Sequence, residues 1–344
     1  MLSRVANSIY WMHRYIERAE NIARFVDANL NLTLDLLPGS QEQWEPLVLT
    51  LGELPLFNSR YDEPSRANVI EFLTFDGENP SSILSCLRMA RENARGVRDA
   101  ISSEMWEQVN TFYLFVAAGS HQDLATGDTH TFFNWIKTQS HLFRGVTDDT
   151  MSRGEGWHFG QLGRNIERAD KTCRLLDVKY FILLPSVTEV GSPFDALQWK
   201  ALLKSASAFE MFRKRHGRIN PDRVAEFLIL DRDFPRAICH CLTGAQDSLH
   251  AVAGSRVGTF DNPAEQHLGL LCSQLNFTRI EEIISFGLHE FLNNIQAQLN
   301  LIGGAIFDNF FALQPVEDLD SHRRAWMISR NAGSSIPRAA GGSE

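Results

Sequence analysis

The chain has 344 residues, 44% of them hydrophobic, which is enough apolar material for a large buried core. Its 33 Lys and Arg against 42 Asp and Glu give a formal net charge of −9, which argues against a nucleic-acid or anionic-membrane surface. It has no apolar run near the roughly 20 residues of a membrane span, no signal-peptide pattern, and five cysteines without metal-binding spacing. We therefore expect a soluble cytoplasmic protein with reduced thiols and without a metal or cofactor site.

Helical periodicity runs through almost every long segment, and no segment alternates apolar and polar residues as a strand would. Helices are predicted over residues 3–36, 42–57, 66–75, 80–103, 104–119, 129–148, 155–184, 194–215, 221–231, 233–253 and 262–312. An asparagine followed by proline is expected to cap three of them, at Asn79, Asn220 and Asn262. The sequence therefore predicts an all-α fold, with a disordered tail over the polar residues 315–344.

The chain also repeats itself. Three positions near its start recur 150 residues further on, Glu17, Arg18 and Asp27 as Glu167, Arg168 and Asp177. A second segment, 71–90, recurs in part as 226–245, at an offset of 155 residues. Shared offsets of this length predict an internal duplication that makes two pseudo-symmetric helical-bundle halves, residues 1–150 and 151–314.

The first predicted helix carries polar side chains along one edge of its apolar face. At 100° per residue, Glu17, Glu20 and Arg24 share this edge, and Glu20 and Arg24 are four residues apart and can touch. Arg18 points about 100° away from Glu17. The two therefore cannot pair with each other, and we expect each to find a partner on a different neighbouring helix.

The carboxylate edge has two interpretations. Partly buried Glu-Arg pairs can lock helices together, or the same residues can line an interhelical pocket that binds a cationic or zwitterionic group. A di-metal site is disfavoured because the usual Glu-x-x-His pattern is absent, and His13 has no counterpart in the second copy, where Gly163 stands.

A second candidate is the arginine-rich segment that begins at residue 88. Arg91, Arg95 and Arg98 share a face there, and the segment offers two opposite-charge pairs at four-residue spacing, Arg88 with Glu92 and Arg95 with Asp99. These pairs permit a self-paired, solvated surface. However, the aligned positions of the second half are Gln246, His250 and Ala253. The cluster therefore belongs to one half only, which favours a site for a carboxylate or phosphate there.

Three segments carry a family resemblance: MLSRVANSIYWMHRYIERAENIARFVD, RENARGVRDAISSEMWEQVN and GRNIERADKTCRLLD. Together they resemble the bacterial alpha-E domain family, which is all-helical and named for its glutamates and its Glu-Arg motif, over about residues 1–310. The chain departs from that pattern at His13, where glycine is expected. The resemblance implies association with circularly permuted ATP-grasp ligases, which form amide bonds. Its motifs point to the binding residues Glu17, Arg18, Glu20, Arg91, Glu92, Arg95, Glu104, Glu167 and Arg168, to which the arginine cluster adds Arg98.

Two functional hypotheses follow. In the first, the protein is an accessory partner of an ATP-grasp amide ligase and binds a small peptide, an amino acid or the ligase itself through a Glu/Arg-rich interhelical site. In the second, it is itself an enzyme of the same peptide-synthesis or modification pathway. The sequence lacks a phosphate-binding loop and a nucleophile with an evident partner, which favours the first hypothesis. An unrelated structural role is the third possibility.

Overall fold

The computed structural model describes residues 1–34, 42–119, 129–182 and 193–312. Every regular element in these ranges is a helix, which confirms the predicted all-α fold. The predicted tail, 315–344, lies outside the described residues. Residues Met1–Phe311 form one unit, which contains every helix of the described ranges.

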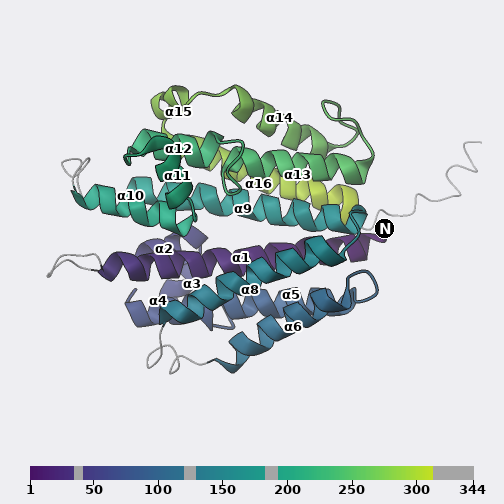
Figure 1. The fold of residues 1–344 in the computed structure, drawn as a ribbon, viewed down its shortest axis with the longest axis horizontal. Helices are drawn as coiled ribbons and strands as arrows, with labels where there is room; N and C mark the ends of the chain where they lie inside the picture. Colours follow the sequence, from purple (N-terminus) through teal and green to yellow (C-terminus); the bar gives the residue numbers. More distant parts are fainter. Residues whose placement is uncertain (35–41, 120–128, 183–192, 313–344) are drawn as a thin grey trace, which may run out of the picture. The chain divides into compact units, whose positions relative to one another are not determined.

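The helices follow one another in two series (Figure 1). The first series is α1 (Ser3–Leu34), α2 (Glu45–Leu51), α3 (Leu54–Asn58), α4 (Arg66–Thr74), α5 (Ile83–Gly96), α6 (Ser103–Ala118) and α8 (Thr129–Thr150). The second series is α9 (Glu155–Ile182), α10 (Pro193–Ser205), α11 (Phe209–His216), α12 (Pro221–Leu230), α13 (Ile238–Ala253), α14 (Pro263–Phe277), α15 (Ile280–Phe286), α16 (Leu288–Ile306) and the π-helical turn η2 (Phe307–Phe311).

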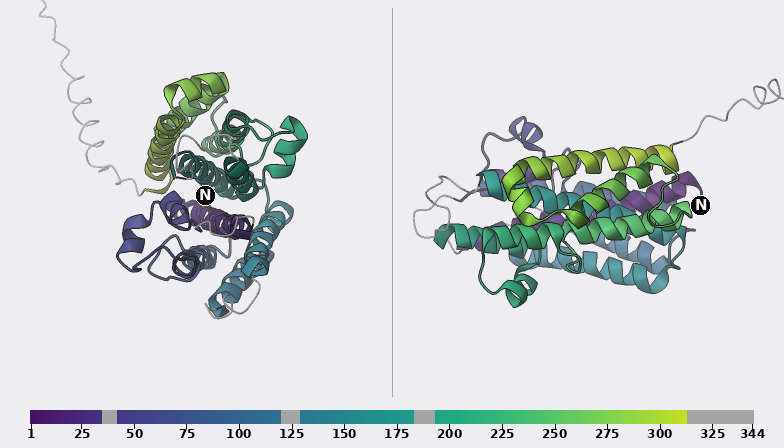
Figure 2. Two further views of the ribbon diagram at one scale, coloured as in Figure 1. Left: turned by 90° about the vertical axis from the view of Figure 1, so that its left-hand side faces the viewer. Right: turned by 90° about the horizontal axis from the view of Figure 1, so that it is seen from above.

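The long helices α1 and α9 run side by side through the middle of this unit (Figures 1 and 2). They approach closely because Gly163 has no side chain: a Cβ atom there would lie 2.4 Å from the carbonyl oxygen of Tyr10. Gly160 likewise leaves room for the ring of His13, since its Cβ would lie 2.7 Å from Nε2 of that histidine. Contacts between residues about 150 apart at several levels show that the two helices are parallel and nearly in register.

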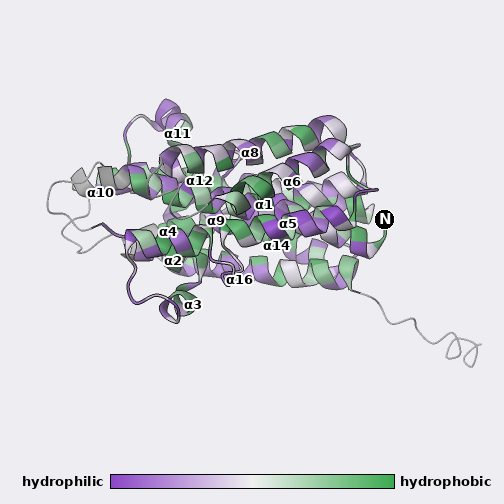
Figure 3. Cartoon of the chain, turned by 90° about the horizontal axis from the view of Figure 1, so that it is seen from below, coloured by the Kyte–Doolittle hydropathy of each residue, from purple (hydrophilic) through white to green (hydrophobic). Residues whose placement is uncertain are grey.

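Two hydrophobic cores flank this helix pair. One is built from buried residues between Ile9 and Phe143, and the other from Ala6, Tyr10 and residues between Phe159 and Phe311. Helices α4, α5, α6 and α8 lie on one side of the pair, and α12, α13, α14 and α16 on the other (Figure 1). Many of the helices carry hydrophobic and hydrophilic bands, as amphipathic helices do (Figure 3). The two cores fit the proposed halves, and the duplication itself remains a proposal.

Three predicted helices are wrong in length because the chain turns within them. The predicted helix 42–57 is split at Gly52, which has a φ of 77°. The predicted helix 194–215 is split near Ser207, at a φ of 51°, and 262–312 is split at Thr278 and at Gly287, whose φ is 111°. Positive φ is incompatible with a right-handed helix, so each such residue ends one.

The helix predicted over 80–103 is shorter in the structure, where α5 begins at Ile83 and ends at Gly96. Asn79 does not cap it, because the side chain of Ser82 accepts the hydrogen bond from the backbone N–H of Ser85 instead. The caps predicted at Asn220 and Asn262 are confirmed. Among the described residues, no helix combines the length and the apolar character that a membrane crossing requires.

Candidate functional site

Two buried ion pairs cross between α1 and α9. Arg168 donates from Nε and Nη2 to the two carboxylate oxygens of Glu17, at 2.8 and 2.6 Å. Arg18 makes the same bidentate contact with Glu167, at 2.7 and 3.0 Å. Both carboxylates are buried. Each arginine therefore binds the glutamate of the other Glu-Arg pair.

The prediction that Glu17 and Arg18 do not pair with each other is confirmed, whereas the expectation of two different partner helices is wrong. Both side chains reach α9, because that helix carries the second Glu-Arg pair at the same level as the first. Glu17 also accepts a hydrogen bond from Arg236, at 3.1 Å from Nη1 to Oε1. Although burial alone would raise the pKa of Glu17, Arg168 and Arg236 hold it below its usual range.

Around Glu17, polar side chains fill the space between the helices, and we call this the closed side of the crossed pairs. Glu20 accepts from Arg24, which confirms that predicted pair, and from Arg236 and Ser140. These cations hold the pKa of Glu20 well below its usual range against the opposing effect of burial. Burial lowers the pKa of Arg236 to about 10, and the neighbouring Arg24 acts in the same direction. Little space remains among these side chains.

A small cavity of about 10 Å³ lies on this closed side, against His13, Glu17, Glu20 and Arg164. Burial, assisted by the charge of Arg164, lowers the pKa of His13 to about 3. Within the described residues, Nε2 of His13 and Nε of Arg164 have no hydrogen-bond partner. The imidazole is therefore neutral at physiological pH and fills space without bonding at this nitrogen.

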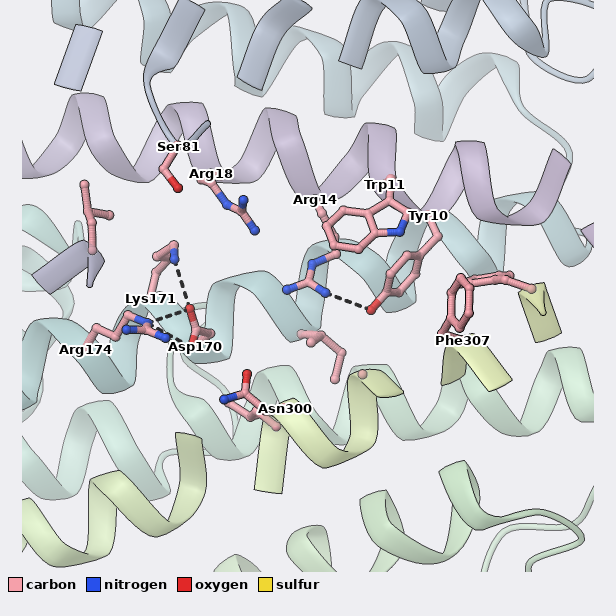
Figure 4. A pocket seen from close by; sticks show the side chains of 15 residues that line it. Tyr10, Trp11, Arg14, Arg18, Ser81, Asp170, Lys171, Arg174, Asn300 and Phe307 are labelled. Atoms are coloured by element: carbon pink, nitrogen blue, oxygen red, sulfur yellow. Dashed lines mark hydrogen bonds and ion pairs between the residues drawn. The ribbon is translucent and has the colours of Figure 1, made fainter. Parts of the chain in front are cut away.

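The Glu167 side is open. A pocket of about 360 Å³ lies between α1, α9, α16 and η2, within the usual size range of ligand sites (Figure 4). Its lining combines basic, polar and aromatic side chains: Tyr10, Trp11, Arg14, Arg18, Leu51, Ser81, Ile166, Asp170, Lys171, Arg174, Leu299, Asn300, Gly303, Phe307 and Phe311. One end is polar, and the other is aromatic (Figure 4).

At the polar end, Asp170 accepts from Lys171 Nζ and Arg174 Nε, each at 3.0 Å. Between the two ends, Arg14 donates to Glu167 at 2.9 Å and to the hydroxyl of Tyr10 at 3.2 Å. The guanidinium carbon of Arg14 also lies 4.7 Å from the centre of the Trp11 ring. A cation stacked in this way is held in place by both charge and ring contact.

The arginine cluster of α5 lies apart from this pocket, since none of its members lines it. Arg91 donates to Asn110 at 2.7 Å and to Glu92 at 2.9 Å, and Arg95 lies 3.4 Å from Glu92. The predicted pairs Arg88–Glu92 and Arg95–Asp99 are therefore wrong. Glu92 pairs with Arg91 instead of Arg88, and Arg95 pairs with Glu92 instead of Asp99. Arg98 instead stacks over Trp106, with 4.9 Å between guanidinium carbon and ring centre.

The structure brings together half of the residues predicted for the site, Glu17, Arg18, Glu20, Glu167 and Arg168. The others, Arg91, Glu92, Arg95, Arg98 and Glu104, lie on or next to α5 and α6, outside the pocket lining. The prediction did not include the neighbouring Arg14, Asp170, Lys171, Arg174 and Arg236. Asp170 and Arg174 were detectable as repeats of Glu20 and Arg24. Among the described residues, no group of three or more His, Cys, Asp or Glu side chains is arranged to hold a metal ion.

The protein is thus an all-helical protein of the class in which two Glu-Arg pairs bind each other across parallel helices. The Alpha-E family model, described as a predicted alpha-helical domain with a conserved ER motif, matches residues 1–311. The chain belongs to the Alpha-E family. Its pairs Glu17-Arg18 and Glu167-Arg168 both carry the two residues of that motif.

The chain is also similar to uncharacterized proteins of Mycobacterium bovis and Mycobacterium tuberculosis, at 24% identity over 93% of its own length. It spans about two fifths, 39%, of the length of these curated relatives. No solved structure gives a significant match.

Proposed function

We propose that this chain is an accessory binding protein of an ATP-grasp-type amide ligase and that its open pocket receives an anionic ligand of that system. The observation that carries the proposal is the convergence of Arg14, Arg18, Lys171 and Arg174 on a pocket in whose lining, among the described residues, Asp170 is the one carboxylate. Guanidinium groups bind carboxylates and phosphates through paired hydrogen bonds. The link to a ligase rests on the family resemblance.

The pocket keeps hydrogen-bond donors for such a ligand. Among the described residues, Nη1 of Arg18 and both terminal nitrogens of Arg174 have no partner. Both side chains are held by their other nitrogens, Arg18 by Glu167 and Arg174 by Asp170. Donors fixed in this way lose little conformational entropy when a ligand binds.

The arginine cluster on and just after α5, of which Arg95 and Arg98 are exposed, fits a second role in the same proposal. Arg95 is 67% exposed, and among the described residues its one ion pair, with Glu92, is long at 3.4 Å. We assign Arg91, Arg95 and Arg98 to the docking of an acidic surface of the ligase or of its substrate. In this arrangement the α5 cluster contacts the partner while the pocket holds the small ligand.

The alternative, an enzyme of the same pathway, has less support. All five cysteines are buried, and burial raises the pKa of each thiol, which disfavours the thiolate that a nucleophile needs. The glutamates of the crossed pairs are likewise engaged with arginines and kept ionised. This arrangement suits binding better than proton transfer.

The test is to combine the purified chain with the ATP-grasp ligase encoded by the same organism. We expect the two to co-elute in gel filtration, and ADP and amide product to form faster in the presence of the chain. Arg174→Met should reduce this stimulation while the complex persists, because the pocket and the docking surface are separate. A ligase that neither binds the chain nor changes its rate would refute the proposed function.

A further inference from the structure

The two sides of the crossed pairs carry residues of different size at a matched position of the repeat. The offset of 155 residues places Ser81 of the first half opposite Arg236 of the second. Arg236 reaches into the closed side and bonds to Glu17, Glu20 and Asn21, at 2.5 to 3.1 Å. Ser81 is too short to do the same on the open side and donates to Glu53 at 2.9 Å.

A second difference between the halves restores the positive charge that the open side lacks at Ser81. The offset of 150 residues matches Asn21 with Lys171, and the ammonium of Lys171 lies 3.0 Å from Asp170 and 3.5 Å from Glu167. Each side therefore holds one extra cation, supplied by Arg236 on the closed side and by Lys171 on the open side. Because Lys171 extends from α9 itself, the described residues leave room next to Ser81 for the pocket of about 360 Å³, whereas the closed side has a cavity of about 10 Å³.

The charges around the open pocket limit what it can bind. Arg14, Arg18, Lys171 and Arg174 are positive, and the carboxylates that they or Ser81 contact belong to Glu167, Asp170 and Glu53. Four positive charges against three negative ones leave a single positive charge. A ligand with one negative charge balances it, whereas a phosphate dianion exceeds it.

The other end of the pocket is apolar and aromatic. Tyr10 and Phe311 are buried, with ring centres 5.3 Å apart, and Trp11 and Phe307 are at least partly accessible along the same wall (Figure 4). Rings of this kind bind aromatic or aliphatic groups by stacking and by burial of apolar surface. The ligand therefore needs an apolar part on the side away from Arg174.

We propose that the open pocket binds one molecule of a hydrophobic N-acyl amino acid or the C-terminal residue of a short peptide, its carboxylate at Arg18 and Arg174 and its side chain at Trp11 and Phe307. This inference rests on the proposed function, of which it names the substrate class. The free α-amino group of an unmodified amino acid would add a positive charge and is disfavoured.

The test is calorimetric titration of the whole chain with N-acetylphenylalanine. We expect one site per chain and binding at least ~10-fold weaker for N-acetylphenylalanine amide, because a charge-assisted hydrogen-bond pair is lost. Acetate and inorganic phosphate, which lack the ring, should also bind at least ~10-fold more weakly. N-acetyl-Gly-Gly-Phe distinguishes a peptide terminus from a free acylated amino acid, since only a site open to solvent at the acyl end accepts it.

Variants locate the site. Ser81→Arg introduces the arginine of the closed side and should abolish binding, whereas Ser103→Arg adds the same charge at an exposed position of α6 and should not. Arg174→Met should weaken binding of the acid and leave that of the amide unchanged. Circular dichroism verifies that each variant is folded.

Equal binding of acid and amide, or full binding by folded Ser81→Arg, would overturn the assignment. If acetate or phosphate binds as tightly as N-acetylphenylalanine and Ser81→Arg abolishes both, the hydrophobic substrate class is wrong and the anionic pocket of the proposed function stands. If none of these anions binds to the folded wild-type chain, the pocket part of both proposals fails.

Discussion

Arg168 holds both oxygens of Glu17 from a position 151 residues further along the chain, and both side chains are almost completely buried. A buried ion pair costs desolvation when it forms, so its net contribution to stability is small. Removing one partner is different, because the other charge then stays buried without compensation. The crossed pairs are consequently more sensitive to single substitutions than surface pairs are.

Glu17→Ala should lower the free energy of unfolding by about 3–5 kcal/mol, since it leaves the buried Arg168 without its counter-charge and removes one of the two carboxylates that Arg236 contacts. Urea denaturation followed by circular dichroism measures the change. Glu104→Ala, on the exposed first turn of α6, is the control and should shift stability by less than about 0.5 kcal/mol. A Glu17→Ala protein as stable as the control would contradict the structural role of the pair.

Gly163→Ala should destabilise the protein by about 1–3 kcal/mol or more, because its methyl group would clash with the carbonyl oxygen of Tyr10 at 2.4 Å. Gly145→Ala is a matched control within α8, where nothing lies within 4 Å of the added atom. That change should stabilise by about 0.5–1 kcal/mol through helix propensity. Thermal unfolding of both variants tests the close approach of α1 and α9, and shifts of the same sign would argue against it.

His13 should make the protein less stable as the pH falls from about 6.5 towards 3. Its pKa is lowered from 6.5 to about 3 in the folded state, so in this window the unfolded chain binds a proton that the native protein does not. The slope contributed is about 1.4 kcal/mol per pH unit. Urea titrations at several pH values should show a shallower dependence for His13→Gln than for wild type, whereas His267→Gln should match wild type. Parallel curves for wild type and His13→Gln would refute the burial of a neutral imidazole.

Arg95→Lys should weaken binding of the ligase, or its stimulation, while the helical content and melting temperature stay unchanged. Lysine keeps the charge and loses the planar fork that donates two parallel hydrogen bonds. Because Arg95 is 67% exposed, a stability change above about 0.5 kcal/mol is not expected. If Arg91→Ala, Arg95→Ala and Arg98→Ala all bind and stimulate normally, the cluster is a self-paired surface.

The fold class was predictable because amphipathic periodicity and caps are local properties of the chain. Asn220 and Asn262 cap their helices as predicted, since a side chain and a backbone N–H three residues on suffice. The split at Ser207 was not predictable, because a serine at positive φ carries no local signal and is held there by its surroundings.

The candidate site was predictable only in part. The helical spacing of 100° per residue places Glu17, Glu20 and Arg24 on one edge of the first helix. Two of their contacts, Glu20–Arg24 and Glu17–Asn21, lie within α1 itself. The open pocket depends instead on which side chain is missing next to α9. The sequence does show that Ser81 stands where the second half has Arg236. It does not show that both positions face the crossed pairs, and without this the difference does not predict a pocket.

The reach of Arg236 across 219 residues to Glu17 has a consequence for synthesis on the ribosome. At about 5–20 residues per second, Glu17 emerges roughly 10–40 s before its last partner is made. Arg168 is made earlier and pairs with Glu17, but Arg236 alone contacts both Glu17 and Glu20 from the second half of the chain. We therefore expect a stalled or truncated chain that ends before residue 236 to leave this side of the network incomplete and to be more sensitive to proteolysis.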